Sequence, residues 1–448
     1  MNKTAKSLIG VLLVLLLAAS FVACGGGKKD DGIIELTVLN YMDLSNPGSI
    51  NEMNDVWERF EKANPDIRIV REDLFDEPFH QKTEAYAAAG QIPDVIQCWP
   101  SGRSTTLHTQ RLLKDLAPFV ARDGLASQYT PVSLDPSQQA AGYLGMITRG
   151  MTATNAVFVN MEVLNDCGLQ PAKTYSELIA QMPILRAKGY DTLVMSTNQT
   201  WVMQSCLFSA IAGRFCGEGW DQRIHSGQAK FTDPDFVAAL EFVKRMYDDG
   251  LLTQAMFAID YTAAPADLAN NKAAYLIDGD WQTGAFISTG MDLLTPEQQK
   301  KLFVTVFPEI DIPGVKIPAR TNTVVLATGW GMNANIPAGS AKEEAAWRLV
   351  KWLVGKECVS FFLENGTFAA GSRTDIDAST LKLEPAQVAT SKLGGEYDVS
   401  TVVIDAAFEG PVYTPLNDGL AAIGMGTMTP QQVASVTQAA FDNWKASQ

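Results

Sequence analysis

Short apolar runs alternate with helical patterns from residue 33 onward, and this order restricts the possible folds more than any other feature. Strand-like runs lie at 33–40, 67–70 and 94–99, while helical patterns begin at Ser49 and cover 79–89. Apolar side chains recurring three and four positions apart mark a helix, and short apolar runs mark buried strands. The order strand, helix, strand, helix, strand predicts a parallel sheet covered by helices.

The middle and the C-terminal part repeat this alternation with other lengths. Further strands are expected at 155–160, 191–195, 273–278, 301–307 and 322–328. Ser49, Thr174 and Ser340 are each followed by a glutamate three residues later, which is the spacing of a capping box and predicts helix starts. We therefore expect two α/β blocks, with late strands available to return to the first block.

The N-terminal residues have the pattern of a secretory signal peptide. Lys3 and Lys6 precede an apolar run over 8–19, which is too short for a stable transmembrane span. Small residues and a cysteine follow this run. Residues 1–23 are therefore expected to be removed. The sequence contains no second long apolar run, so no membrane-spanning segment is predicted.

The stretch Ser20–Cys24 resembles a bacterial lipobox, with Cys24 as the lipidated residue. Phe21 stands where leucine is usual, so a secreted form without lipid stays open as an alternative. The glycines and charged residues of 24–32 are typical of a flexible, lipidated tether. The mature protein is expected to be anchored to a membrane and not inserted in it.

The charge of the chain argues against two classes of partner. The formal net charge is −15, and removal of 1–23 takes away two lysines and no acid, which gives −17. Such an acidic protein is a poor partner for nucleic acid and for anionic lipid surfaces. Solubility alone also explains this charge.

Cysteine and histidine patterns offer no site for catalysis or metal. With Cys24 acylated, five cysteines remain, no C-x-x-C occurs, and a bridge between Cys206 and Cys216 stays possible. The three histidines are far apart, and H-E-x-x-H, G-x-S-x-G, Walker-type and D-x-D-x-D-G motifs are missing. No metal and no cofactor are expected. Two carboxylates of a glycoside hydrolase could still meet in space.

Tryptophans at the ends of strands and helices are candidates for ligand contact. Aromatic rings cover the apolar faces of sugars, and ligands gather at the carboxyl ends of parallel strands. The residues in such positions are Trp99, Trp201, Trp281 and Trp330. Those within helical patterns are expected to be packing residues: Trp57, Trp347, Trp352 and Trp444.

Four segments, in order and spacing, resemble a known family. They are GQIPDVIQCW, FVNMEVLNDCGLQPAKTYSELIAQMPILRAKG, LANNKAAYLIDGDW, and GWGMNANIPAGSAKEEAAWRLVKWLVGKECVSFFLENG. Over about residues 33–445 the chain is similar to extracellular solute-binding proteins of family 1, the maltose-binding-protein-like receptors of bacterial ABC importers.

The resemblance implies an α/β, two-lobed, periplasmic-binding-protein-like type II fold. Each lobe would be a mainly parallel sheet flanked by helices, and a hinge would join the lobes. The first lobe would comprise 33–148 and 301–337, and the second 149–300 and 338–448. A ligand would lie in the cleft between them.

The resemblance also carries roles to individual residues. Trp99 would stack on sugar from the first lobe, and Trp201 and Trp281 would face it from the second. Asp43 would bind hydroxyls. The remaining candidates for ligand binding are Tyr41, Arg103, Arg149, Trp330 and Tyr413. For Arg103 and Arg149, surface or interlobe ion pairs remain an alternative role.

The expected function is that of a non-enzymatic receptor. The protein would capture a carbohydrate, expected to be an oligosaccharide, and deliver it as a monomer to the permease subunits of an ABC importer. It would be exported and lipid-anchored at the cell membrane, periplasmic or at the cell surface. A receptor for a sugar acid or another small organic anion, held by Arg103 and Arg149, and a surface glycoside hydrolase remain alternatives.

Overall fold

The computed structural model describes residues 32–368 and 370–447. The expected signal peptide at 1–23, Cys24 and most of the tether at 24–32 lie outside the described residues. Within the described ranges, every helix is too short or too polar to span a bilayer.

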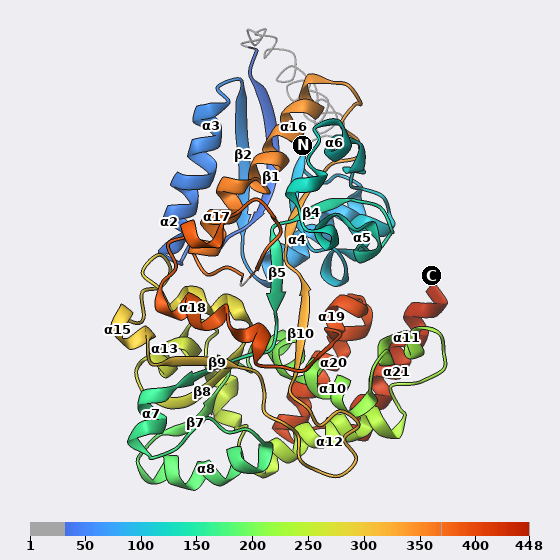
Figure 1. Cartoon of the computed structure of the whole chain (residues 1–448). Helices are drawn as coiled ribbons and strands as arrows, with labels where there is room; N and C mark the ends of the chain where they lie inside the picture. Colours follow the sequence, from blue (N-terminus) through green and yellow to red (C-terminus); the bar gives the residue numbers. More distant parts are fainter. Residues whose placement is uncertain (1–31, 369, 448) are drawn as a thin grey trace, which may run out of the picture.

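A five-stranded sheet, in the order β2-β1-β3-β11-β4, forms the centre of what we call the first lobe (Figure 1). Its strands are β1 (Ile34–Tyr41), β2 (Ile67–Leu74), β3 (Val95–Cys98), β4 (Met146–Thr148) and β11 (Gly329–Met332). β1 pairs in parallel with β2 and β3, as the alternation of strands and helices predicts. The late strand β11 returns to this sheet between β3 and β4 and runs antiparallel to both.

Helices cover this sheet with their apolar faces. They are α2 (Gly48–Glu52), α3 (Arg59–Ala63), α4 (Glu77–Ala89), α5 (Thr105–Thr109), α6 (Ala117–Arg122), α16 (Ala341–Leu353) and α17 (Lys356–Glu364). Ser340 caps α16 as predicted, because its side chain accepts a hydrogen bond from the Glu343 amide. Ser49 makes no such cap; its hydroxyl donates to the Asp43 carbonyl, and Pro47 precedes the helix instead.

A four-stranded sheet, in the order β7-β8-β6-β9, forms the centre of the second lobe. Its strands are β6 (Ala156–Asn160), β7 (Asp191–Val194), β8 (Ala273–Asp278) and β9 (Leu302–Thr305). The expectation of a mainly parallel sheet is wrong here, because only β7 and β8 are parallel and β6 is antiparallel to β8 and β9. β6 enters this sheet travelling away from the first lobe, whereas β8 and β9 travel back toward it.

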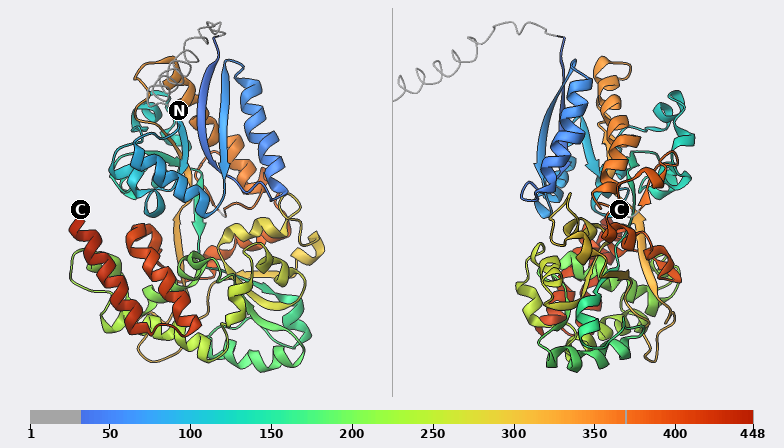
Figure 2. Two further views of the ribbon diagram at one scale, coloured as in Figure 1. Left: turned by 180° about the vertical axis from the view of Figure 1, so that it is seen from behind. Right: turned by 60° about the vertical axis from the view of Figure 1, so that its left-hand side comes forward.

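The helices of the second lobe surround this sheet (Figure 2). They are α7 (Met161–Asp166), α8 (Tyr175–Ala187), α9 (Thr200–Val202), α10 (Ser209–Cys216), α11 (Trp220–His225), α12 (Pro234–Asp248), α13 (Ala263–Ala269), α14 (Thr283–Phe286), α15 (Pro296–Gln299), α18 (Pro385–Thr390), α19 (Ile404–Ala407), α20 (Gly410–Met425) and α21 (Pro430–Ser447). Thr174 caps α8 as predicted. Cys206 and Cys216 are free thiols, so the bridge left open by the sequence is not formed.

A third, small sheet connects the two lobes. Its order is β12-β5-β10-β13, with β5 (Gly150–Ala153), β10 (Thr321–Leu326), β12 (Ala370–Gly371) and β13 (Val399–Thr401). β5 and β10 pair antiparallel and run along the axis that joins the lobes (Figure 1). These two strands form the crossing between the lobes.

The lobe boundaries differ from those expected in two places. β9, expected in the first lobe within 301–337, pairs with β6 in the second. α16 and α17, expected in the second lobe within 338–448, pack on the first-lobe sheet, and their buried side chains belong to its core. Both differences arise from pairings between distant segments, which local hydrophobic patterns do not encode.

Trp330 lies in the core of the first lobe. It sits on β11 between two neighbouring strands, is 0% exposed and contacts the Trp57 ring edge-to-face at a centroid distance of 5.7 Å. The ligand contact expected for Trp330 is therefore wrong, because its ring packs on the helix side of the sheet and away from solvent.

We expect Trp330→Ala to lower the free energy of unfolding by about 3–5 kcal/mol, since it deletes a large buried ring. Urea denaturation of the purified protein measures this loss. Ligand affinity of the folded fraction should stay unchanged. A variant that is as stable as the wild type but binds ligand poorly would contradict the core position.

Candidate functional site

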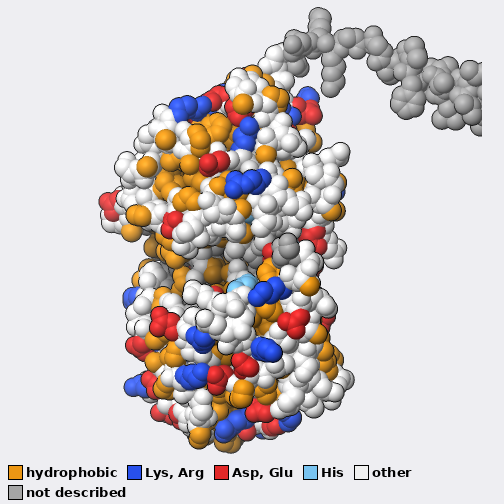
Figure 3. All heavy atoms as spheres, turned by 90° about the vertical axis from the view of Figure 1, so that its right-hand side faces the viewer, with side chains coloured by type: hydrophobic (Ala, Val, Ile, Leu, Met, Phe, Trp, Pro, Cys, Tyr) orange, Lys and Arg blue, Asp and Glu red, His pale blue; other side chains and the backbone are white. Residues whose placement is uncertain are grey.

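A cavity of about 630 Å³ lies between the two lobes, and both contribute side chains to it. Figure 3 shows the surface hollowed at mid-height, with hydrophobic side chains in the hollow. The residues that line the cavity include Tyr41, Asp43, Glu52, Asp76, His80, Gln97, Trp99 and Arg103 of the first lobe, Trp201, Tyr261, Trp281, Gln282 and Asp405 of the second, and Arg149, Thr152, Val324 and Thr328 at or near the crossing.

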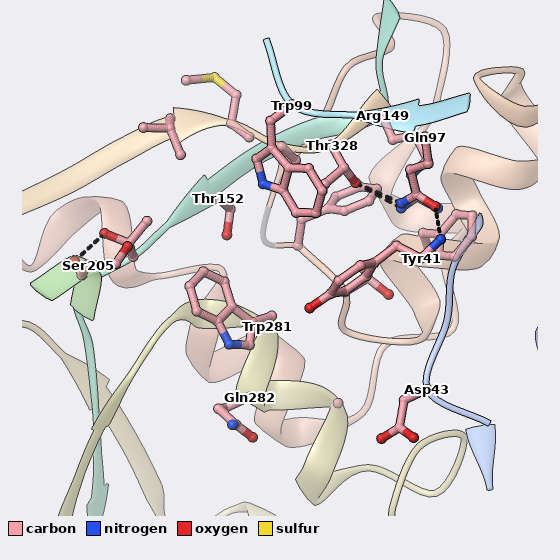
Figure 4. A pocket seen from close by; sticks show the side chains of 18 of the residues that line it. Tyr41, Asp43, Gln97, Trp99, Arg149, Thr152, Ser205, Trp281, Gln282 and Thr328 are labelled. Atoms are coloured by element: carbon pink, nitrogen blue, oxygen red, sulfur yellow. Dashed lines mark hydrogen bonds between the residues drawn. The ribbon is translucent and has the colours of Figure 1, made fainter. Parts of the chain in front are cut away.

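Trp99 forms the first-lobe wall of this cavity (Figure 4). It follows β3 directly and is half-buried, whereas its neighbour Cys98 is fully buried on the other side of the strand. Its ring centroid lies 5.4 Å from that of Tyr41 and 4.9 Å from that of His80. The Trp99 amide donates to the Ser104 hydroxyl at 3.0 Å, which holds the backbone. One edge of the ring is thus packed, and the ring still faces the cavity.

Two second-lobe tryptophans face Trp99 as a group with Tyr261. Trp201 lies 5.4 Å from Tyr261 and 6.0 Å from Trp281, measured between ring centroids. The Trp281 indole donates to the Tyr261 hydroxyl at 2.6 Å. Sequence reasoning found both tryptophans and missed Tyr261, because Tyr261 lies in a loop without a recognisable pattern.

Polar groups at the end of β3 connect the first lobe to the crossing. Gln97 accepts from the Tyr41 amide at 3.0 Å and donates to the Thr328 hydroxyl at 3.1 Å (Figure 4). Arg149 donates to the same hydroxyl at 3.0 Å. Gln97 and Thr328 were missed by sequence reasoning, although an amide within the apolar run DVIQCW is a signal that could have drawn attention to Gln97.

Tyr413 does not line this cavity. It lies on α20, where its ring lies 5.8 Å from the Arg103 guanidinium and borders a separate groove of about 550 Å³. The contact with ligand in the main cavity that was expected for Tyr413 is therefore not formed; the loose resemblance in this segment gave the wrong neighbour.

His80 lines the cavity beside Trp99. Burial lowers the pKa of His80 to about 2, so this ring stays neutral beside Trp99. Within the described ranges, no group of three or more His, Cys, Asp or Glu side chains is arranged to hold a metal ion.

Asp278, at the end of β8, contacts two second-lobe residues that line the cavity, Tyr261 and Gln282. It is fully buried and accepts hydrogen bonds from the Gly279 amide at 2.7 Å and the Gln282 side chain at 3.1 Å. The Tyr261 hydroxyl lies 3.4 Å away. Burial raises the pKa of Asp278 to about 6, from an ordinary value of 3.8, and the hydrogen bonds oppose this rise.

This shift makes a pH-dependent contribution to stability that Asp278→Asn should remove. Between about pH 4 and 6 the folded state binds more protons at Asp278 than the unfolded state, so stability falls as pH rises. The full penalty above pH 6 is up to about 3 kcal/mol. Urea denaturation measures the free energy of unfolding of both proteins. The value for the variant minus the value for the wild type should rise by up to about 3 kcal/mol between pH 4 and pH 8. The exposed Asp191→Asn is the control, and parallel pH profiles for Asp278→Asn and wild type would contradict the shift.

Comparisons with known proteins agree with this architecture. A model of the family "Bacterial extracellular solute-binding protein" matches residues 46–357. The maltotriose-binding protein of Pyrococcus abyssi is 21% identical over 329 residues, 73% of this chain and 63% of that protein. The sn-glycerol-3-phosphate-binding periplasmic protein of Salmonella typhimurium is 26% identical over 167 residues, 34% of this chain and 36% of that protein. These matches span less than two thirds of either relative.

Solved structures show the same fold. A protein of xylan utilization by Caldanaerobius polysaccharolyticus superimposes with a TM-score of 0.79 at 22% identity, covering 91% of this chain and 99% of that one. The maltose/maltodextrin-binding domain from Bdellovibrio bacteriovorus, bound to maltotriose, gives 0.69 at 19% identity, covering 92% and 100%. The fold is therefore the type II periplasmic-binding-protein-like α/β fold. From the family match over most of its length, the chain belongs to the bacterial extracellular solute-binding protein family.

Proposed function

We propose that this protein is the substrate-binding component of an ABC importer and captures an oligosaccharide in the cavity between its lobes. The observation that carries this proposal is that aromatic rings of both lobes face one cavity, with Tyr41 and Trp99 on one side and Trp201 and Trp281 on the other. Sugar rings expose apolar faces that such side chains cover. The volume of about 630 Å³ is in the range of small-molecule sites.

Polar side chains between these walls suit the rim of a sugar. Asp43, Gln97, Thr152 and Gln282 line the same cavity and offer acceptors and donors to hydroxyl groups. Two relatives also support a saccharide, since one is a maltotriose-binding protein and one superimposed domain holds maltotriose. The function needs binding and release only, and we assign no catalytic step.

Membership of an extracellular family makes this an exported protein. We further propose that Cys24 carries the lipid anchor, that the mature protein is a monomer, and that it delivers its ligand to a permease pair at the membrane. The tether at 24–32 would let the two lobes reach the permease.

The lobes are proposed to close on the ligand by a hinge at β5 and β10. A close contact between the lobes at Gly102 supports this. Gly102, in the first lobe, has φ +55°, and a Cβ at this position would lie 1.6 Å from the carbonyl oxygen of Asp405 in the second lobe. Arg103 beside it lies 3.7 Å from the Asp405 carboxylate. This contact joins the two lobes beside the cavity.

Binding is tested by calorimetry with maltotriose, cellotriose and N,N′,N″-triacetylchitotriose, followed by chromatography of the ligands. Trp99→Ala and Trp281→Ala should each weaken the observed affinity at least tenfold, because each removes a stacking face; tenfold corresponds to about 1.4 kcal/mol. Trp444→Ala, on α21 and outside the cavity, is the control. Unchanged affinity in both cavity variants, or turnover of the saccharide, would refute the proposal.

Closure is tested by Gly102→Ala. The added methyl group should hold the lobes apart and weaken ligand affinity at least tenfold, with a faster dissociation rate. Gly124→Ala is the matched control, since Gly124 has φ +65° and no atom within 4 Å of the new Cβ. Both variants carry the backbone strain of a left-handed alanine, about 1–2 kcal/mol. Equal affinities in the two variants would mean that this contact plays no part in closure.

A further inference from the structure

The charged side chains that line the main cavity include more acidic than basic groups. Four carboxylates line it, those of Asp43, Glu52, Asp76 and Asp405, against the two guanidinium groups of Arg103 and Arg149. The cavity therefore has two more carboxylates than cations, since His80 stays neutral. The partners of each group decide what charge a ligand meets.

Both guanidinium groups are already engaged by protein groups. Arg103 forms an ion pair with Glu77 at 2.8 Å and approaches Asp405 at 3.7 Å. Arg149 is 5% exposed, lies 3.9 Å from the centroid of the Phe362 ring and donates to the Thr328 hydroxyl. Its Nε is buried and has no hydrogen-bond partner. The charge of Arg103 is therefore already paired with a protein carboxylate, whereas Arg149 contacts a ring face and a hydroxyl and has no carboxylate within ion-pair distance among the described residues.

Three of the four carboxylates, by contrast, have no cation within ion-pair distance among the described residues; they are Asp43, Glu52 and Asp76. Glu52 accepts a hydrogen bond from the Trp57 indole N–H at 3.3 Å, whereas Asp43 and Asp76 lie together at neighbouring strand ends. Asp43 follows β1 and Asp76 follows β2, and because these strands are parallel, their ends meet at the same edge of the sheet. Asp43 accepts from the amide and hydroxyl of Ser45 at 2.9 and 2.6 Å. Its charge is solvated locally and not neutralised.

Asp76 is the more exposed to the influence of a ligand. It has φ +56°, and its side chain does not cap α4, the helix that it precedes. Burial raises the pKa of Asp76, as does the neighbouring Glu77, while the positive charge of Arg103 opposes this rise. Across the cavity the Trp201 indole N–H is near enough to lower that pKa, yet has no hydrogen-bond partner of its own. A ligand hydroxyl at this point would meet a carboxylate acceptor from Asp76 and an indole N–H donor from Trp201.

From this arrangement we propose that the cavity is a charge filter, which accepts saccharides without negative charge and rejects uronic acids and phosphorylated sugars or polyols, with Asp76 as the main determinant. The inference rests on the proposed saccharide-binding function and names its substrate class. Hydroxyl groups donate to Asp43 and Asp76, whereas a ligand carboxylate would face them at short range in a site of low dielectric. The pairing of Arg103 with Glu77 also argues against Arg103 as the group that would hold a sugar acid.

The test compares ligands that differ only in charge. Calorimetry on the full mature chain measures each of the three neutral trisaccharides against its derivative in which C6 of the non-reducing sugar is oxidised to a carboxylate. We expect at least tenfold weaker binding of every oxidised form and no binding of sn-glycerol-3-phosphate. The difference should shrink as salt rises, because screening weakens the repulsion.

Asp76→Asn should reduce the discrimination at least threefold while the neutral form still binds, because asparagine keeps the shape, tolerates positive φ and removes the charge. Asp55→Asn makes the same change on the exposed surface of the first lobe and should leave the ratio unaltered. Equal or tighter binding of the oxidised form, or an unchanged ratio in Asp76→Asn, overturns the filter and leaves saccharide binding standing. If no saccharide binds in either form, the proposed function fails and the filter with it.

Discussion

The antiparallel pairing of β5 with β10 is the interaction on which the arrangement of the site depends. Val324, Val325 and Leu326 pair with Ala153, Thr152 and Met151, and several of these side chains line the cavity. The pairing also positions the second-lobe wall, because the Asp280 carboxylate accepts from the Ala153 amide at 2.9 Å and from the Thr152 hydroxyl. Trp281 is the next residue after Asp280. The crossing therefore sets where one stacking ring stands relative to the first lobe.

Local pattern was sufficient for the elements and for some of the site. The strand ends at Trp99 and the capped helix starts at Thr174 and Ser340 follow from short stretches of sequence. Trp330 has the same kind of sequence environment as Trp99, yet β11 is inserted between β3 and β4 and its ring meets Trp57. Only the long-range pairing distinguishes these two tryptophans, and no local pattern reports it. The same reason explains why β9 and α16 belong to other lobes than expected.

Charge in the site was still less accessible to sequence reasoning. Two arginines near a cleft suggest an anion site, but Arg103 meets Glu77 from α4 and Asp405 from α19, which lie far apart in the chain. A partnered guanidinium and a free one look alike in a sequence. Asp76 was missed because nothing in its neighbourhood distinguishes it from a surface acid, and its importance comes from what lies across the cavity.

Closure and charge selection are two aspects of one energetic problem. If the lobes close as proposed, Asp76 lies in an enclosed cavity near Trp201, where an ionised carboxylate is costly unless it accepts hydrogen bonds. A ligand hydroxyl that donates a hydrogen bond to Asp76 offsets this cost. A neutral saccharide would therefore stabilise the closed arrangement of the lobes. A ligand carboxylate adds a second charge to the same enclosed volume and makes closure more costly. Selection by charge would therefore be expressed mainly in how far the lobes can close, because the aromatic faces on either wall treat both kinds of sugar alike.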